Sequence, residues 1–109
     1  GTITGTWTGR FEIPKGDYSA DFTVQLEQSG NDITGDAITS DGCKGTLTGT
    51  IEGDIIKFEM KWEKSGKCCK SKWDGTAILT CSQDHMIMTF TLKDKCNGNA
   101  VGYGELRKQ

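Results

Sequence analysis

The chain has 109 residues, of which 34% are hydrophobic and 26% charged, and its formal net charge is −2. This length suits a single domain spanning residues 1–109, with a core of its own but little stability to spare. The composition suits a strand-rich soluble protein better than a disordered or collagen-like chain, and no apolar run approaches the roughly 20 residues needed to span a bilayer. Because the charge gives no general attraction to nucleic acid or anionic membranes, we expect neither nucleic-acid binding nor membrane insertion.

Eight segments alternate apolar and polar residues, as strands with one buried and one solvated face require. In the first segment, residues 2–13, Trp7 shares its parity with Ile3 and Phe11. The other strands are expected at 20–28, 33–39, 43–52, 55–64, 73–81, 85–93 and 100–107. In the last segment Ala100, Gly102, Gly104 and Leu106 compete with Val101 and Tyr103 for the interior, so its phase stays open.

The connections between these segments are of hairpin length, and no stretch has a 3.6-residue period. Consecutive strands should therefore be antiparallel neighbours. The pattern predicts an all-β fold, an eight-stranded antiparallel up-and-down meander. Closure into a barrel would remove both edges of such a sheet, and the interior of eight strands holds only their own side chains or one small ligand. An open sandwich is the alternative.

Several short motifs follow one another in a familiar order: Gly5-Thr6-Trp7, Ile33-Thr34-Gly35, Leu47-Thr48-Gly49-Thr50, Phe58 with Trp62, and Lys72-Trp73-Asp74-Gly75. In order and rough spacing they resemble the avidin and streptavidin barrels, and more distantly the calycin group with its lipocalins. Avidin-type biotin sites use an Asn and a Ser in and just after the first strand, where this chain has Thr8, Gly9 and Arg10. The resemblance thus implies the barrel without implying biotin binding.

Five cysteines in so short a chain favour an oxidising compartment, so we expect a secreted, periplasmic or cell-surface protein from which any signal peptide was removed. A cytosolic protein with reduced cysteines is the alternative. In a meander, four of the cysteines gather at one end: Cys43, Cys68, Cys69 and Cys96. We predict two disulfides, each joining Cys68 or Cys69 to a neighbouring loop, with free thiols or a zinc site as alternatives. Cys81 falls at the opposite end, on the apolar side of the sixth strand, as a buried or rim thiol without a role.

The same end collects lysines, including Lys67 and Lys70 beside Cys68 and Cys69, whereas the turns of the other end carry aspartates and glutamates. A basic mouth would attract an anionic ligand or partner, although loop lysines often only keep a protein soluble. Inward glycines leave space in the interior, which large side chains fill or a ligand shares. A closed aromatic core and an aromatic-lined pocket are both compatible with the pattern.

The leading functional hypothesis is a non-enzymatic protein that binds a small apolar or amphipathic, possibly anionic, molecule at the mouth formed by residues 14–19, 40–44, 64–72 and 93–99. Its predicted ligand-binding residues are Trp7, Trp62, Trp73, Phe58, Phe90, Lys67 and Lys70. Trp62 and Trp73 would stack on the ligand, and Lys67 or Lys70 would meet a carboxylate. The rival hypothesis is a protein-interaction, inhibitor or surface module with a filled core and disulfide-tied loops.

Catalysis has little support in the sequence. His85 is the single histidine, on the polar face of its strand, and the nucleophile, metalloprotease, phosphate-loop and dinucleotide motifs do not occur. We therefore expect no enzyme, no cofactor and no metal, while an oligomer remains open.

Overall fold

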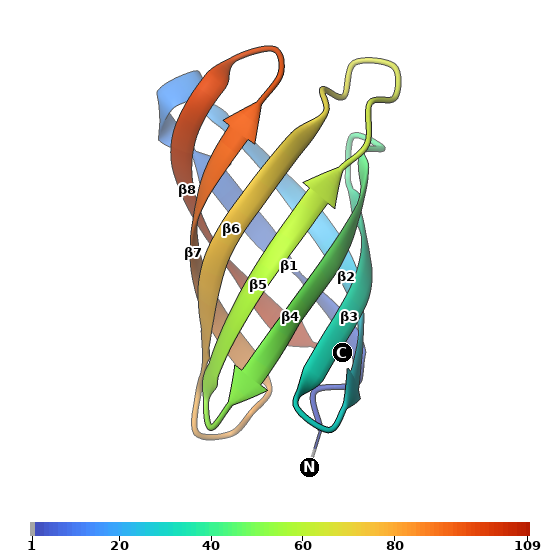
Figure 1. Cartoon of the computed structure of the whole chain (residues 1–109), viewed down its shortest axis with the longest axis vertical. Coiled ribbons are helices and arrows are strands. Elements are labelled where there is room, and N and C mark those ends of the chain that lie inside the picture. The colour runs from blue at the N-terminus through green and yellow to red at the C-terminus, as the bar shows by residue number, and fades with distance from the viewer. Residues whose placement is uncertain (1) are drawn as a thin grey trace.

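The computed structural model describes residues 2–109 as one closed barrel of eight antiparallel strands (Figure 1). The strands are β1 (Gly5–Ile13), β2 (Tyr18–Ser29), β3 (Asp32–Thr39), β4 (Lys44–Glu52), β5 (Ile55–Trp62), β6 (Ser71–Leu79), β7 (His85–Asp94) and β8 (Gly98–Lys108). Each strand pairs with its sequence neighbours, and β1 pairs with β8 to close the sheet. A single 3-10 turn, Pro14–Gly16, connects β1 to β2. The predicted up-and-down barrel is confirmed, and the open sandwich is excluded.

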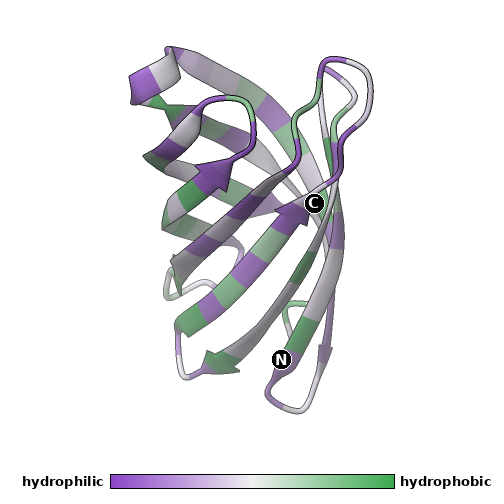
Figure 2. Cartoon of the chain, turned by 45° about the horizontal axis from the view of Figure 1, so that its top comes forward, coloured by the Kyte–Doolittle hydropathy of each residue, from purple (hydrophilic) through white to green (hydrophobic). Residues whose placement is uncertain are grey.

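The alternation read from the sequence is the alternation of the barrel wall, visible as bands of opposite hydropathy along the strands (Figure 2). Trp7, Trp62 and Trp73 are all buried, as predicted. In β8, Leu106 points inward while Val101 and Tyr103 are exposed, which settles the phase that the sequence left open. Cys81 lies at the predicted end of the barrel as an exposed thiol, but its placement on the apolar side of the sixth strand was wrong, because β6 ends at Leu79 and Cys81 belongs to the turn that follows.

The segment before β1 packs into the end of the barrel that holds both chain termini (Figure 1). Ile3 is buried there, and its carbonyl oxygen accepts a hydrogen bond of 2.9 Å from the indole nitrogen of buried Trp7. The Trp7 side chain thus finds a polar partner in the core, as a buried indole requires. Within residues 2–109, no helix has the length and apolar character to cross a membrane.

Glycines and phenylalanines alternate along one row of the inner wall. The row crosses five strands through Gly49, Phe58, Gly75, Phe90 and Gly102, each directly paired with the next. A Cβ atom on Gly75 would lie 2.6 Å from the tip of the Phe58 ring and 2.6 Å from the Thr89 carbonyl oxygen. The absent side chains therefore provide the space that the aromatic rings occupy, which is how glycine lets a barrel wall curve tightly around a filled interior.

We predict that Gly75→Ala destabilises the barrel on the order of 2 kcal/mol or more, because the added methyl group meets both a packed ring and the backbone. Gly16→Ala is the control, since a Cβ there meets nothing within 4 Å, and its effect should stay within about 0.5 kcal/mol. Urea denaturation followed by tryptophan fluorescence measures both. Equal stability of the two variants would contradict the close packing of this row.

Candidate functional site

Four connections form one end of the barrel and carry most of the sequence features predicted to matter. We define the basic rim as residues 14–17, 40–44, 63–70 and 93–97, which include these connections and the strand ends beside them. One disulfide joins the long β5–β6 connection to the β3–β4 connection, and a second joins it to the β7–β8 connection. Cys43 pairs with Cys68, and Cys69 pairs with Cys96. The two predicted disulfides are confirmed, and the pairing that the sequence left open is now defined.

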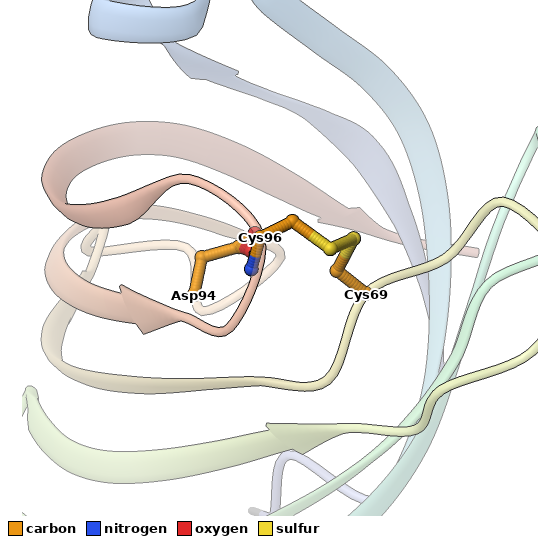
Figure 3. Close-up of side chains that lie close together, drawn as sticks. All are labelled: Cys69, Asp94 and Cys96. Atoms are coloured by element: carbon orange, nitrogen blue, oxygen red, sulfur yellow. A yellow bond between two sulfur atoms is a disulfide. The ribbon is translucent and has the colours of Figure 1, made fainter.

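The turn around Cys96 is organised by Asp94 (Figure 3). The Asp94 Oδ1 atom accepts hydrogen bonds from the backbone N–H groups of Cys96 (2.7 Å) and Asn97 (3.1 Å). This local aspartate turn sets the direction of the β7–β8 connection. The ligand-type atoms of Cys69, Asp94 and Cys96 lie within 4.8 Å of one another. The two sulfur atoms are bonded to each other, so neither is a thiolate, the form in which cysteine binds zinc.

The β3–β4 connection is held by a second aspartate. Asp41 accepts hydrogen bonds from the Tyr18 hydroxyl (2.9 Å) and the Thr39 hydroxyl. The Thr39 oxygen in turn accepts a hydrogen bond of 2.9 Å from the Cys43 N–H. Burial raises the pKa of Tyr18 to about 12, with further contributions from the hydrogen bond to Asp41 and from its charge. The hydrogen bond from Thr39 is the main cause that lowers the pKa of Asp41. Each disulfide of the rim thus has an ordered aspartate turn beside it.

Positive charge dominates the basic rim. Its seven lysines are all exposed: Lys15, Lys44, Lys64, Lys67, Lys70, Lys93 and Lys95. Four carboxylates accompany them, Asp17, Asp41, Glu63 and Asp94. Among residues 2–109, no rim lysine forms a salt bridge, whereas Lys61 and Lys72 on the outer wall both bond to Glu59. The hairpin connections at the opposite end, with the strand ends that they join, carry Asp32, Glu52, Asp54 and Asp84 and no lysine, so the connections at the two ends of the barrel differ in charge.

The five aromatic residues predicted to contact a ligand all lie inside the wall, and Trp73 packs against both Trp62 and Phe90. Trp73 stacks on Phe90, with ring centroids 3.8 Å apart and planes 6° from parallel, and Trp62 lies 5.3 Å from Trp73. Phe58 is buried midway along the barrel, opposite Gly49 and Gly75. Phe11, which the sequence did not single out, lies at the centre of this cluster, 4.9 Å from Trp73. These side chains fill the space that the inward glycines leave.

The predicted residues do not form one group. Trp7 is buried near the end of the barrel that holds the chain termini, so the structure does not bring it to Lys67 and Lys70. Those two lysines lie on the β5–β6 connection, and their exposed side chains belong to the rim surface. Two hollows of about 520 and 530 Å³ lie on the outer wall, one over β4–β6 and the other over β8 and β1–β3. Neither is lined by Trp62 or Trp73.

One buried polar atom at the rim end has no partner. In the described part of the chain, the indole nitrogen of Trp62 is the only buried side-chain nitrogen or oxygen without a hydrogen bond. Trp62 is only 6% exposed and ends β5, directly below the long connection. An unpaired buried donor costs free energy until an acceptor reaches it. Sequence periodicity places Trp62 inside but cannot reveal that its N–H lacks a partner.

Comparison with protein-family models finds no match, and neither does comparison with curated proteins. The chain is similar to the solved structure of a de novo designed fluorescence-activating β-barrel, with a TM-score of 0.72 and 23% sequence identity. The similarity covers 97% of this chain and 93% of the designed one. At this identity it shows the fold, a small eight-stranded barrel, and it does not distinguish an avidin or calycin relationship from any other.

Removal of one disulfide by Cys69→Ala with Cys96→Ala should lower the free energy of unfolding by about 3–4 kcal/mol, because the bridge closes a loop of 27 residues. Cys81→Ala is the control and should change stability by less than about 0.5 kcal/mol, since Cys81 is exposed and unpaired. Urea denaturation measures both effects. In the monomeric protein, alkylation and intact mass should count one free thiol before reduction and five afterwards. Five free thiols before reduction would contradict the bridged rim.

Proposed function

We propose that this protein is a non-enzymatic binding module whose basic rim contacts an acidic surface of a partner protein. The observation that carries the proposal is the set of seven exposed lysines, none in a salt bridge within the described residues, on connections that two disulfides hold in place. Fixed loops lose little conformational freedom on binding, so more of the interaction energy becomes affinity. Complementary charge accelerates association and selects the partner.

The packing of the interior supports a surface function. The aromatic rings that would hold a small molecule already fill the barrel, and Phe58 and Phe90 occupy the space over the inward glycines. A ligand in that position would have to displace part of the core. Binding through the rim requires no such change, and the barrel then serves as a rigid support for its loops.

The proposal includes an oxidising location, secreted, periplasmic or on the cell surface. Both disulfides connect different loops and hold the rim together, and such structural bridges persist where thiols are not kept reduced.

The proposed function includes no catalytic step. His85 interacts with the exposed Glu105 at 3.0 Å on the outer wall, at the end of β7 away from the rim.

Poly-L-glutamate is a suitable probe for an acidic surface. We expect the protein to bind it at low ionic strength, and Lys67→Glu with Lys70→Glu to weaken binding at least about tenfold, because each change replaces an attractive charge with a repulsive one. The matched control is Lys57→Glu with Arg107→Glu, which changes the net charge equally but lies on the outer wall. Isothermal titration calorimetry measures all three proteins. Equal weakening by both double variants would show attraction to net charge alone and overturn the rim as the site.

A second candidate, a carrier of a small apolar or amphipathic molecule, is favoured by the unpaired N–H of Trp62. A ligand that entered between the rim loops would offer an acceptor to this donor and a carboxylate to Lys67 or Lys70. The similar designed barrel is described as fluorescence-activating, and its fold matches this one over nearly the whole chain. For this candidate the core must open near Trp62.

Titration with fatty acids, retinoids, biotin and aromatic acids tests the carrier function. A carrier would give a saturable change in tryptophan fluorescence, and Trp62→Phe would weaken binding about two- to tenfold through loss of one hydrogen bond. Trp7→Phe is the control because Trp7 lies at the opposite end of the barrel and bonds to Ile3. Unchanged fluorescence with every compound would eliminate the carrier and leave the rim proposal standing.

A further inference from the structure

Three isoleucines form an exposed row on the outer wall, far from the basic rim. Ile55 of β5 is directly opposite Ile78 of β6, which is directly opposite Ile87 of β7. They are 48%, 56% and 55% exposed. Directly opposed side chains on adjacent antiparallel strands have Cβ atoms about 5 Å apart, so the three form one continuous apolar strip. The strip lies towards the end of the barrel where β5 and β7 begin and β6 ends.

The surroundings of the strip mark it as an interaction surface. Of the seven exposed large hydrophobic residues, five lie on β5–β8: these isoleucines, Val101 and Tyr103. Apart from Tyr18 and Ile38, the rest of the outer wall has mainly threonines and charged residues in the outward positions. Single exposed apolar residues are ordinary, whereas a contiguous cluster is typical of a surface that another molecule covers.

The strip reads the same in both directions across the sheet. Glu52 of β4 is opposite Ile55, and Glu105 of β8 is opposite Ile87, so the row runs Glu, Ile, Ile, Ile, Glu with Ile78 at its centre. A two-fold axis along β6 would place Ile78 on Ile78 of a second copy and Ile55 on Ile87. Every isoleucine would then meet an isoleucine, as an isologous interface requires. The glutamates would fall at the margins, where the convex walls of two barrels diverge.

An independent feature lies beside the same axis. Cys81 follows the end of β6 by two residues, is exposed, and is the one cysteine outside the two disulfides. Residues next to a two-fold axis meet their own copies, so the axis along β6 brings the two Cys81 thiols near each other. An odd cysteine in a disulfide-bonded protein is either a free reactive thiol or a residue that pairs between chains, and its place beside the axis favours the second.

We propose that a second copy of this chain covers the isoleucine strip, forming a two-fold dimer that a Cys81–Cys81 disulfide locks. Three isoleucines are far fewer than the about 20 residues that each partner contributes to a standard interface, so the non-covalent dimer is weak. It nevertheless raises the effective concentration of one Cys81 thiol near the other. The bond then forms by exchange with a low-molecular-weight disulfide. The Cys81 thiolate of one copy attacks the reagent, forms a mixed disulfide and releases one thiol. The Cys81 thiolate of the other copy then attacks the Cys81 sulfur of the mixed disulfide and releases the second thiol. Two Cys81 thiols are thus oxidised while one external disulfide is reduced to two thiols.

Sedimentation velocity and oxidative cross-linking test this dimer. In a Cys81→Ser background, which keeps both rim disulfides and prevents the covalent link, the protein should show a concentration-dependent monomer–dimer equilibrium. Ile78→Lys in the same background should be monomeric at every concentration. Ile38→Lys is the matched control, since Ile38 is an isoleucine of similar exposure (46%) on β3, outside the strip, and it should dimerise like the wild type. Ile78→Thr, which retains a β-branched side chain, repeats the test if Ile78→Lys does not fold.

With oxidised glutathione, the wild type should form a covalent dimer whose mass and peptide map show a Cys81–Cys81 bond, and Cys81→Ser should form none. Ile78→Lys should slow this cross-linking at least about tenfold relative to Ile38→Lys, since it removes the association that raises the effective thiol concentration. Equal cross-linking rates in the two lysine variants would show random collision and overturn the proposal. A wild-type protein that stays monomeric up to millimolar concentration would also overturn it, and would assign the strip to a different partner.

Discussion

The alternation of glycine and aromatic side chains on the inner wall is the constraint on which the rest of this structure depends. A narrow barrel must curve tightly and must also fill its interior, and the row from Gly49 to Gly102 meets both needs at once. Where the wall carries no side chain, the Phe58 and Phe90 rings lie against the backbone, closer than any Cβ atom would allow. The same residues therefore let the sheet close into a barrel and fill the interior of that barrel, so a substitution in this row affects both.

In the function that we propose, the filled interior leaves the outer surface of the barrel as the place where a partner binds. The wall is a regular sheet, so the irregular surface available for recognition lies in the connections, and the longest connection, between β5 and β6, is the one bonded on both sides by disulfides. A domain of this size has a small free energy of unfolding, so packing alone would not order such a long segment. The covalent bonds, with the Asp41 and Asp94 turns beside them, supply that order from outside the core.

The parts of this structure that could be predicted from sequence are those set by strict two-residue periodicity and by topology. Parity placed the three tryptophans inside, and the meander placed four cysteines at one end, before their pairing was known. Where side chains give no signal, prediction failed or stayed open. Glycines 102 and 104 carry no apolar side chain, so the phase of β8 was ambiguous, and Cys81 matched the inward parity of a strand that ends two residues earlier. The aspartate turns and the unpaired Trp62 N–H depend on local geometry that periodicity does not encode.

The two surfaces inferred for this molecule are compatible and reinforce each other. The isoleucine strip lies near the end of the barrel opposite the rim, so a dimer formed through Ile78 leaves the rim lysines of both copies free. Strands of such barrels tilt by about 35–45° from the barrel axis, so a two-fold axis along β6 directs both rims to the same side. Two basic rims on one side would engage a repeated acidic surface together, and the second contact would then be intramolecular. Weak attraction at each rim would become tight binding by the pair, which gives a covalent lock at Cys81 a direct functional consequence.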